Sequence, residues 1–326
     1  MQIDESLLAH VAETRQFNEQ YAAAMAASPL GFATAEDALR TRAVLDAAVP
    51  DLEPDRLQPE VLDVGAADPA VTVRLFVPPR VDGVCIQFHM GAWIIGSARA
   101  GDGRSAEIAE RCSLAVVSVE YRMVPEALPP AQLDDALNVV DWVRTSGRER
   151  IGDVPIVLIG ESAGSTLAVL TLLALRESGR LGDDIVGAAL AYGLYDVSGG
   201  PSQRLDGPAL AVFNDAQSLV YPGLAIEERR VASISPLYAD LRGLPPALFT
   251  VGTADALLDD TLFMYERWTA AGNDARLDVY PESLHGFDTF PTAMAAEARR
   301  RIDGFITSRV AAGAGGAGTR RVGADA

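Results

Sequence analysis

A serine lies in a sequence context that favours nucleophilic chemistry. Residues 160–164 (GESAG) follow the apolar run 155–159 and open an apolar stretch with helical spacing. A sharp turn between a buried strand and a helix, with small residues beside it, lifts a serine oxygen above the sheet. The helix N-terminus favours negative charge that develops nearby. Because the turn joins a strand to a helix, we favour Ser162 as a nucleophile over an inert serine in a tight turn.

A serine nucleophile needs a base, and the chain has three histidines. His10 falls in a helical stretch, where a surface position is expected, and His89 ends the apolar run 83–88. His285 follows a strand-like run, and loops at the carboxyl ends of parallel strands carry active groups in such sheets. We therefore expect His285 to be the base.

An acid should orient that histidine, and the loop after the apolar run 247–252 offers Asp255. Its place gives the chain order Ser, Asp, His. A carboxylate there would hold the imidazole and stabilise its charged form. Asp259 and Asp260 come a turn later and are expected to be carboxylates of a helix N-terminus.

Hydrolysis through a tetrahedral intermediate also needs donors for its oxyanion. Residues 89–93 (HMGAW) leave a buried strand and enter an irregular loop. We expect the backbone N–H groups of Gly91, Ala92 and Ala163 to converge on the oxyanion. Losing one such donor typically costs about 10²–10³ in rate. His89 is expected to bond to the backbone.

Strand-like runs alternate with helical spacing over most of the chain. The expected strands are 70–77, 83–88, 114–119, 155–159, 185–192, 247–252 and 276–280, and the expected helices beyond the first 50 residues are 132–144, 163–177, 257–271 and 292–308. This alternation predicts an α/β fold with a mostly parallel sheet and helices on both faces.

Two segments interrupt the alternation and are predicted to form a cap over the sheet. They are the N-terminal helices, residues 1–50, and an insertion at 196–235 that is rich in Gly, Pro and polar residues. The catalytic core is then 51–195 and 236–310. The Gly/Ala-rich residues 311–326 are predicted to be a disordered tail.

Composition excludes several function classes. The net charge of −18 repels phosphate backbones and anionic lipid, so we expect neither nucleic-acid nor membrane partners. The start lacks a basic region followed by an apolar stretch, which predicts a cytoplasmic protein. Cys85 and Cys112 lie in or beside apolar runs and are expected to be buried thiols. Three scattered histidines form no metal cluster.

Four segments together resemble the hormone-sensitive-lipase family of esterases, the bacterial family IV. Residues 89–93 resemble the H-G-G-G-x loop of this family, and 160–164 resemble G-D-S-A-G. Residues 121–126 (YRMVPE), followed by Pro130 and an Asp pair at 134–135, resemble its Y-R-x-x-P-E segment. Residues 252–260 and 285–287 resemble its acid and histidine loops.

The resemblance implies an α/β-hydrolase fold with an eight-stranded sheet, a helical cap, no cofactor and a possible homodimer. It implies hydrolysis of short- to medium-chain esters through an acyl-enzyme. Tyr121, Arg122 and Glu126 would brace the oxyanion loop. Met90 and Ala92 stand where the family has glycines. A positive φ at Met90 would be strained, and its thioether would narrow the acyl pocket.

Two alternatives to a general esterase remain open. One is a specialised hydrolase for a lactone, an amide or an acetylated natural product, with the altered oxyanion loop as part of its adaptation. The other is a non-catalytic ligand receptor, although all three triad residues are present. The pocket walls are expected to include Met90, Trp93, Tyr195 and Phe213.

Overall fold

Eight strands form one sheet in the computed structural model, which describes residues 3–27, 31–65, 70–204 and 207–317. The strands are β1 (Glu60–Val64), β2 (Val71–Phe76), β3 (Gly83–Phe88), β4 (Leu114–Glu120), β5 (Ile156–Glu161), β6 (Ile185–Ala191), β7 (Ala247–Gly252) and β8 (Ala275–Tyr280). Their spatial order is β1-β2-β4-β3-β5-β6-β7-β8. The pairs β1–β2 and β2–β4 are antiparallel, and all the other pairs are parallel. The predicted eight-stranded, mostly parallel sheet is confirmed.

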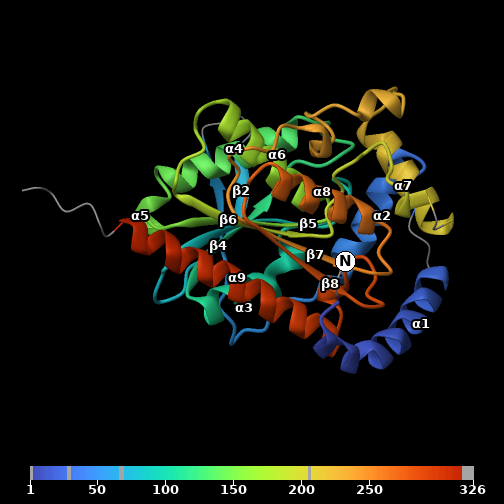
Figure 1. The fold of residues 1–326 in the computed structure, drawn as a ribbon, viewed down its shortest axis with the longest axis horizontal. Coiled ribbons are helices and arrows are strands. Elements are labelled where there is room, and N and C mark those ends of the chain that lie inside the picture. The colour runs from blue at the N-terminus through green and yellow to red at the C-terminus, as the bar shows by residue number, and fades with distance from the viewer. Residues whose placement is uncertain (1–2, 28–30, 66–69, 205–206, 318–326) are drawn as a thin grey trace, which may run out of the picture.

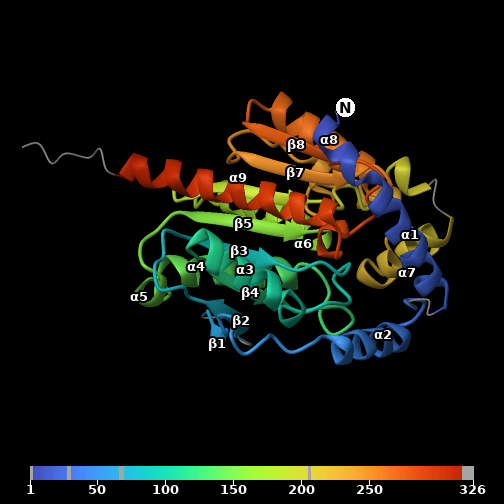
Figure 2. The same cartoon turned by 90° about the horizontal axis from the view of Figure 1, so that it is seen from below.

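Helices cover both faces of this sheet, as Figures 1 and 2 show. One face packs against α3 (Asp102–Cys112) and α9 (Ala293–Ala317), and the other against α4 (Ala131–Arg144), α6 (Ala163–Glu177) and α8 (Leu258–Ala270). Strand β5 shows why two cores result. Ile156 and Leu158 belong to the core on the α6 side, whereas Val157 and Ile159 belong to the core on the α9 side. A strand buried on both faces needs the continuous apolar run that the sequence has there.

The remaining helices are short or lie beyond one end of the sheet. A one-turn helix, α5 (Arg148–Ile151), follows α4. The 3₁₀ helices span Glu5–His10, Arg99–Gly101, Ser202–Arg204, Glu227–Arg229, Pro236–Tyr238 and Phe287–Thr289. No helix in the described ranges has the length and apolar character to cross a membrane.

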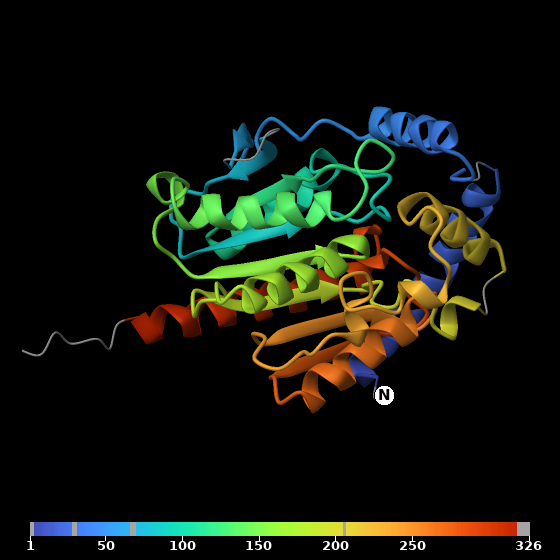
Figure 3. The ribbon, with the colours of Figure 1, turned by 90° about the horizontal axis from the view of Figure 1, so that it is seen from above.

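Three further helices lie beyond the carboxyl ends of the parallel strands, at the same end of the molecule in Figures 2 and 3. They are α1 (Val11–Ala27), α2 (Ala35–Ala48) and α7 (Gly207–Val220). Helix α2 begins after Thr34, which caps its first turn by accepting the Asp37 N–H at 3.1 Å. The two segments expected to form the cap therefore lie at the same end of the sheet.

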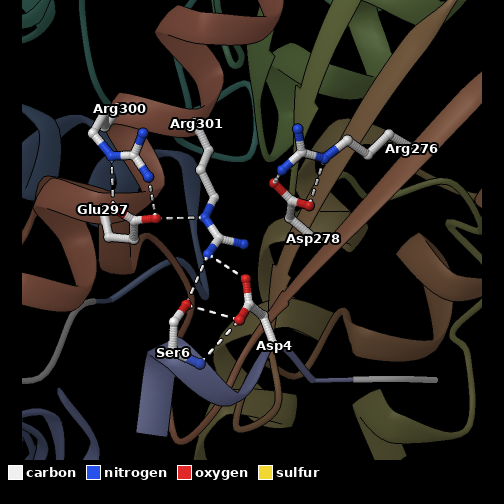
Figure 4. Close-up of polar contacts among 7 residues, drawn as sticks. All are labelled: Asp4, Ser6, Arg276, Asp278, Glu297, Arg300 and Arg301. Atoms are coloured by element: carbon white, nitrogen blue, oxygen red, sulfur yellow. Dashed lines mark hydrogen bonds and ion pairs between the residues drawn. The ribbon is translucent and has the colours of Figure 1, made fainter. Parts of the chain in front are cut away.

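The N-terminal segment is fastened to the last long helix, α9 (Figure 4). Arg301 donates to Asp4 and to Glu297, at 2.6 Å in each case, and the same Asp4 carboxylate accepts from the Ser6 N–H. These donors lower the pKa of Asp4 to about 2, the Ser6 hydrogen bonds contributing most. Leu7 is 1% exposed and packs in a core with residues of β8 and α9. Residues 3–27 are called here the N-terminal arm. The first residues of this arm are thus attached to α9 by hydrogen bonds and to β8 and α9 by packing.

One boundary prediction is wrong. Residues 311–317 continue α9 as a helix, whereas we expected a disordered tail from residue 311. Alanine-rich sequence has the highest helix propensity, which outweighs the glycines in this stretch. Residues 318–326 lie outside the described residues.

Candidate active site

The nucleophile candidate occupies a strained turn between β5 and α6. Ser162 has φ 52° and ψ −117°, a conformation that side chains seldom adopt, and its side chain is nearly buried. Its N–H donates to the Ala191 carbonyl of β6 at 2.9 Å. A Cβ atom on Gly160 would overlap the backbone of Gly164, and one on Gly164 would overlap the Phe88 carbonyl of β3. The two glycines therefore permit the close approach that this turn requires.

Three residues from distant parts of the chain form a hydrogen-bonded line. His285 Nε2 lies 2.9 Å from Ser162 Oγ, and Nδ1 lies 3.0 Å from each carboxylate oxygen of Asp255. The Leu257 N–H donates to Asp255 Oδ1 at 2.7 Å, which fixes the carboxylate. Asp255 follows β7 and His285 follows β8, so the sheet brings together the three residues expected from the sequence.

The electrostatics of this line favour a histidine that can hold a proton. Desolvation alone would lower the pKa of His285. The charge and hydrogen bond of Asp255, together with the charge of Asp288, outweigh it and raise that pKa above its usual value. The His285 side chain is 39% exposed, so solvent or a substrate can reach the imidazole. This arrangement can move a proton from a serine hydroxyl to a leaving group.

The loop after β3 is shaped by three residues with positive φ. The angles are 127° at Gly91, 53° at Ala92 and 62° at Trp93. The Gly91 carbonyl accepts from the Ile94 and Ile95 N–H groups, both at 2.9 Å, which closes the loop. Within the described ranges, no hydrogen bond engages the N–H of Gly91, Ala92 or Ala163. These three donors remain available for an oxyanion.

Met90 is not among the residues with positive φ, so the condition under which its side chain would be strained is not met. The strain falls instead on Ala92 and Trp93. A Cβ atom on Gly286 would lie 3.7 Å from the Met90 Sδ and Cε, so the thioether lies beside the loop that carries His285. Met90 also packs on the core that contains Leu7. Its side chain therefore supports the histidine loop.

His89 contacts the backbone, as expected from the sequence. Its ring stacks on Tyr121 with centroids 4.2 Å apart, and its Nδ1 lies 2.7 Å from the Met90 carbonyl oxygen. Tyr121 donates its hydroxyl to the His89 carbonyl at 2.8 Å. Burial lowers the pKa of His89 to about 4, so it is neutral near pH 7.

The loop after β3 is also tied to α2 by an arginine that sequence reasoning missed. Arg42 Nε donates to the Ile94 carbonyl at 2.7 Å, and its guanidinium also contacts the Val124 carbonyl. Its Nη1 pairs with Glu126 at 2.7 Å. Glu126 therefore braces the loop through Arg42. No motif singled out Arg42, because the contact joins segments about 50 and 80 residues apart.

The expected pocket residues have different outcomes. Trp93 is 3% exposed and meets Tyr221, beyond α7, edge to face with centroids 6.4 Å apart. Tyr195 as a pocket wall is wrong: it is fully buried in the core, with its ring 6.2 Å from that of Phe249. Phe213 lies in α7 at a position whose side chain is outside the described part of the structure.

The aspartates of α8 do more than favour the helix dipole. Both stand in the first turn, as expected. The buried Asp260 also accepts the N–H groups of Tyr195 and Asp196 at 2.8 Å each, and Gln203 Nε2 at 2.7 Å. Burial raises the pKa of Asp260 to about 7. Asp260 thus holds the start of the insertion against the core.

Two other residues near the triad were also missed. Tyr192 donates its hydroxyl to Asp288 at 2.5 Å, and its ring meets the His285 ring edge to face. No sequence motif marks Tyr192, which follows a strand-like run, or Asp288, which lies in a loop.

The described residues contain no group of three or more His, Cys, Asp or Glu that could hold a metal ion. Cys85 and Cys112 are free and buried, as expected.

The fold and the Ser–His–Asp geometry define a serine hydrolase of the α/β-hydrolase fold. A family model described as alpha/beta hydrolase fold matches residues 85–289. Carboxylesterase NlhH of Mycobacterium tuberculosis is 32% identical over 240 residues, which cover 70% of this chain and 74% of that protein.

Solved structures agree with this class. A bacterial heroin esterase superposes with a TM-score of 0.79 at 27% identity, over 89% of this chain and 96% of its own. An esterase from the bacterial hormone-sensitive lipase family superposes with a TM-score of 0.74 at 28% identity, over 95% of this chain and all of its own.

The chain belongs to the hormone-sensitive-lipase family of α/β-hydrolase esterases. It is a serine carboxylic ester hydrolase that acts on small-molecule esters. The comparisons do not favour the specialised deacylating hydrolase or the ligand receptor considered from the sequence.

Proposed function

We propose that Ser162, His285 and Asp255 are the catalytic residues of this esterase. His285 Nε2 removes the Ser162 proton as Oγ attacks the ester carbonyl carbon. The imidazolium then donates that proton to the leaving alkoxide, and an acyl-enzyme remains. A water molecule that loses its proton to His285 then attacks the acyl carbon. As the bond between that carbon and Ser162 Oγ breaks, the imidazolium returns the proton to Oγ and the acid is released. The observation that carries this proposal is the 2.9 Å approach of Nε2 to Oγ, with Asp255 behind it.

We further propose that the backbone N–H groups of Gly91, Ala92 and Ala163 bind the oxyanion. Their lack of other hydrogen-bond partners in the described ranges supports this role. Ala163 begins α6, where the first N–H groups of a helix have no partner within the helix. Donors held in place before the reaction stabilise developing charge without reorganisation.

The proposed substrates are esters of short- to medium-chain acids. The family resemblance supports this range. So does the buried contact of Trp93 with Tyr221, which places two aromatic rings beside the oxyanion loop. The helices α1, α2 and α7 lie over this end of the sheet, which supports their proposed role as a cap that sets specificity. The cytoplasmic location and the homodimer stay predictions, the first from the sequence and the second from the family resemblance.

The test is hydrolysis of p-nitrophenyl esters from acetate to decanoate by the wild type, Ser162→Ala and Ser178→Ala. Ser178 is exposed at the end of α6 and serves as the matched control. We expect turnover in the wild type and Ser178→Ala, its loss in Ser162→Ala, and rates that fall toward decanoate. Wild-type turnover in folded Ser162→Ala would overturn the assignment of the nucleophile. Rates that rise toward decanoate would overturn the proposed acyl range.

A further inference from the structure

The ring of Tyr192 lies against the imidazole of His285. The two ring centroids are 4.9 Å apart and the planes meet at 68°, an edge-to-face contact. Such contacts between rings have preferred geometries, and each stabilises the orientation of its partner. Tyr192 follows β6 and is fully buried, whereas His285 follows β8. The contact therefore reaches the histidine from a strand that carries neither the proposed base nor the proposed acid.

The backbone of Tyr192 is held in an unfavourable conformation. Its φ of 37° lies in the left-handed region, which a bulky aromatic residue seldom occupies. Its N–H donates to the Thr250 carbonyl of β7 at 2.7 Å, which holds the main chain in place. Strain of this kind persists where the surrounding structure enforces it, and it gathers at functional sites.

The hydroxyl of Tyr192 is fixed as firmly as its backbone. It donates to Asp288 Oδ1 at 2.5 Å in a buried setting. Asp288 lies in the 3₁₀ helix Phe287–Thr289, and its carbonyl accepts from Arg299 of α9. The side chain of Tyr192 is thus held at its far end, and its ring cannot tilt without breaking this bond.

Asp288 belongs to a buried polar cluster beneath the nucleophile. With Gln87, Arg104 and Glu161 it lines a cavity of about 10 Å³, room for about one water molecule. Burial raises the pKa of Glu161 to about 8. Burial also raises the pKa of Asp288, and this effect outweighs the hydrogen bond from Tyr192, which lowers the same pKa. An acceptor for Tyr192 exists in either protonation state, because a protonated carboxyl keeps a carbonyl oxygen.

We propose that Tyr192 is a positioning residue for catalysis, and that its bond to Asp288 holds its ring where it fixes the plane of the His285 imidazole. In that plane Nδ1 faces Asp255 and Nε2 faces Ser162. The inference rests on the proposed catalytic role of His285. Tyr192 itself is assigned no contact with the substrate.

The first test compares Tyr192→Phe with Tyr280→Phe. Tyr280 is also fully buried, but among the described residues its hydroxyl has no hydrogen-bond partner, so its variant controls for the loss of a buried hydroxyl. With p-nitrophenyl acetate we expect Tyr192→Phe to lower kcat about tenfold and to change KM less than about twofold. Tyr280→Phe should keep the wild-type kcat. A folded Tyr192→Phe with wild-type kcat, or an equal loss in both variants, would overturn the inference.

A second test does not depend on Tyr192→Phe folding. Asp288→Asn keeps an oxygen that accepts the Tyr192 hydroxyl, whereas Asp288→Ala removes it. We expect Asp288→Ala to lower kcat about tenfold, and Asp288→Asn to remain within about threefold of the wild type. Equal kcat in the two variants would refute the role of this bond. The Ser162→Ala variant tests the proposed function separately from the role of Tyr192. Turnover retained by Ser162→Ala would overturn the proposed function, whatever the Tyr192 variants do.

Discussion

Both carboxylate oxygens of Asp255 lie 3.0 Å from the Nδ1 of His285. Because a carboxylate only accepts hydrogen bonds, this contact requires the proton of a neutral His285 to be on Nδ1. Nε2 is then free to accept the proton of Ser162. The side chain of Asp255 is fully buried and lies behind the ring, so its charge acts on the imidazole with little solvent screening.

Asp255→Asn should lower kcat by about 10²–10⁴, because an amide at this place can favour the wrong tautomer. The acid limb of kcat/KM should also move to lower pH. Asp255 raises the pKa of His285, so its removal lets the imidazole stay neutral in more acidic solution. Steady-state rates from about pH 5 to pH 9 measure both effects. Asp274→Asn, at an exposed position, is the control; an unmoved acid limb in Asp255→Asn would contradict the prediction.

Gly91→Ala should lower kcat/KM by about 10² or more, through loss of oxyanion donors. A Cβ atom there would overlap the Ile95 carbonyl, and φ is 127°. Ala92→Gly is the matched change, because φ of 53° is easier for glycine. It should retain activity within about threefold, since the N–H donor remains. Initial rates with p-nitrophenyl acetate and circular dichroism of both variants check this; equal activities would count against the assigned loop.

Leu7→Ala should destabilise the protein by about 2–4 kcal/mol, because it removes a buried side chain from the core beside α9. Leu7 is 1% exposed, whereas its neighbour Leu8 is 57% exposed. Leu8→Ala should therefore change the free energy of unfolding by less than about 0.5 kcal/mol. Urea denaturation followed by tryptophan fluorescence measures the difference. Equal effects of the two substitutions would mean that the N-terminal arm is not docked as described.

Asp260 should make stability depend on pH. Its pKa is raised from 3.8 to about 7 in the folded protein, so the folded state favours the protonated form. Its contribution to stability is full below about 3.8 and is lost as pH rises through about 7. The free energy of unfolding of the wild type, relative to Asp260→Asn, should be larger at about pH 5 than at about pH 8. Urea titrations at both pH values test this, and a pH-independent difference would refute it.

Much of the sheet and the triad could be predicted from the sequence because their signals are local. The bounds of β3, α6 and β7 agree with the runs 83–88, 163–177 and 247–252. The small residues around Ser162 marked its turn. Helix α3 was not predicted, because it is polar on average: charged residues alternate with a buried face of small residues and Ile108, so no apolar run marks it.

The rest of the site depends on contacts that no local pattern records. Arg42 of α2 reaches the loop after β3, and the Tyr192 ring, which follows β6, meets the His285 ring, which follows β8. The error at Tyr195 has the same origin. An aromatic residue after a strand can face a pocket or the core, and only the packing around Phe249 decides which.

The bond between Asp4 and Arg301 has a consequence for synthesis. The two residues are 297 positions apart, so the N-terminal arm is synthesised long before the helix on which it docks. At about 5–20 residues per second, the N-terminal arm waits roughly 15–60 s for its partner helix. Until then the arm, with Leu7, has no core to join. The arm therefore docks only after α9 has been synthesised, and a nascent chain that stalls before α9 carries an undocked arm.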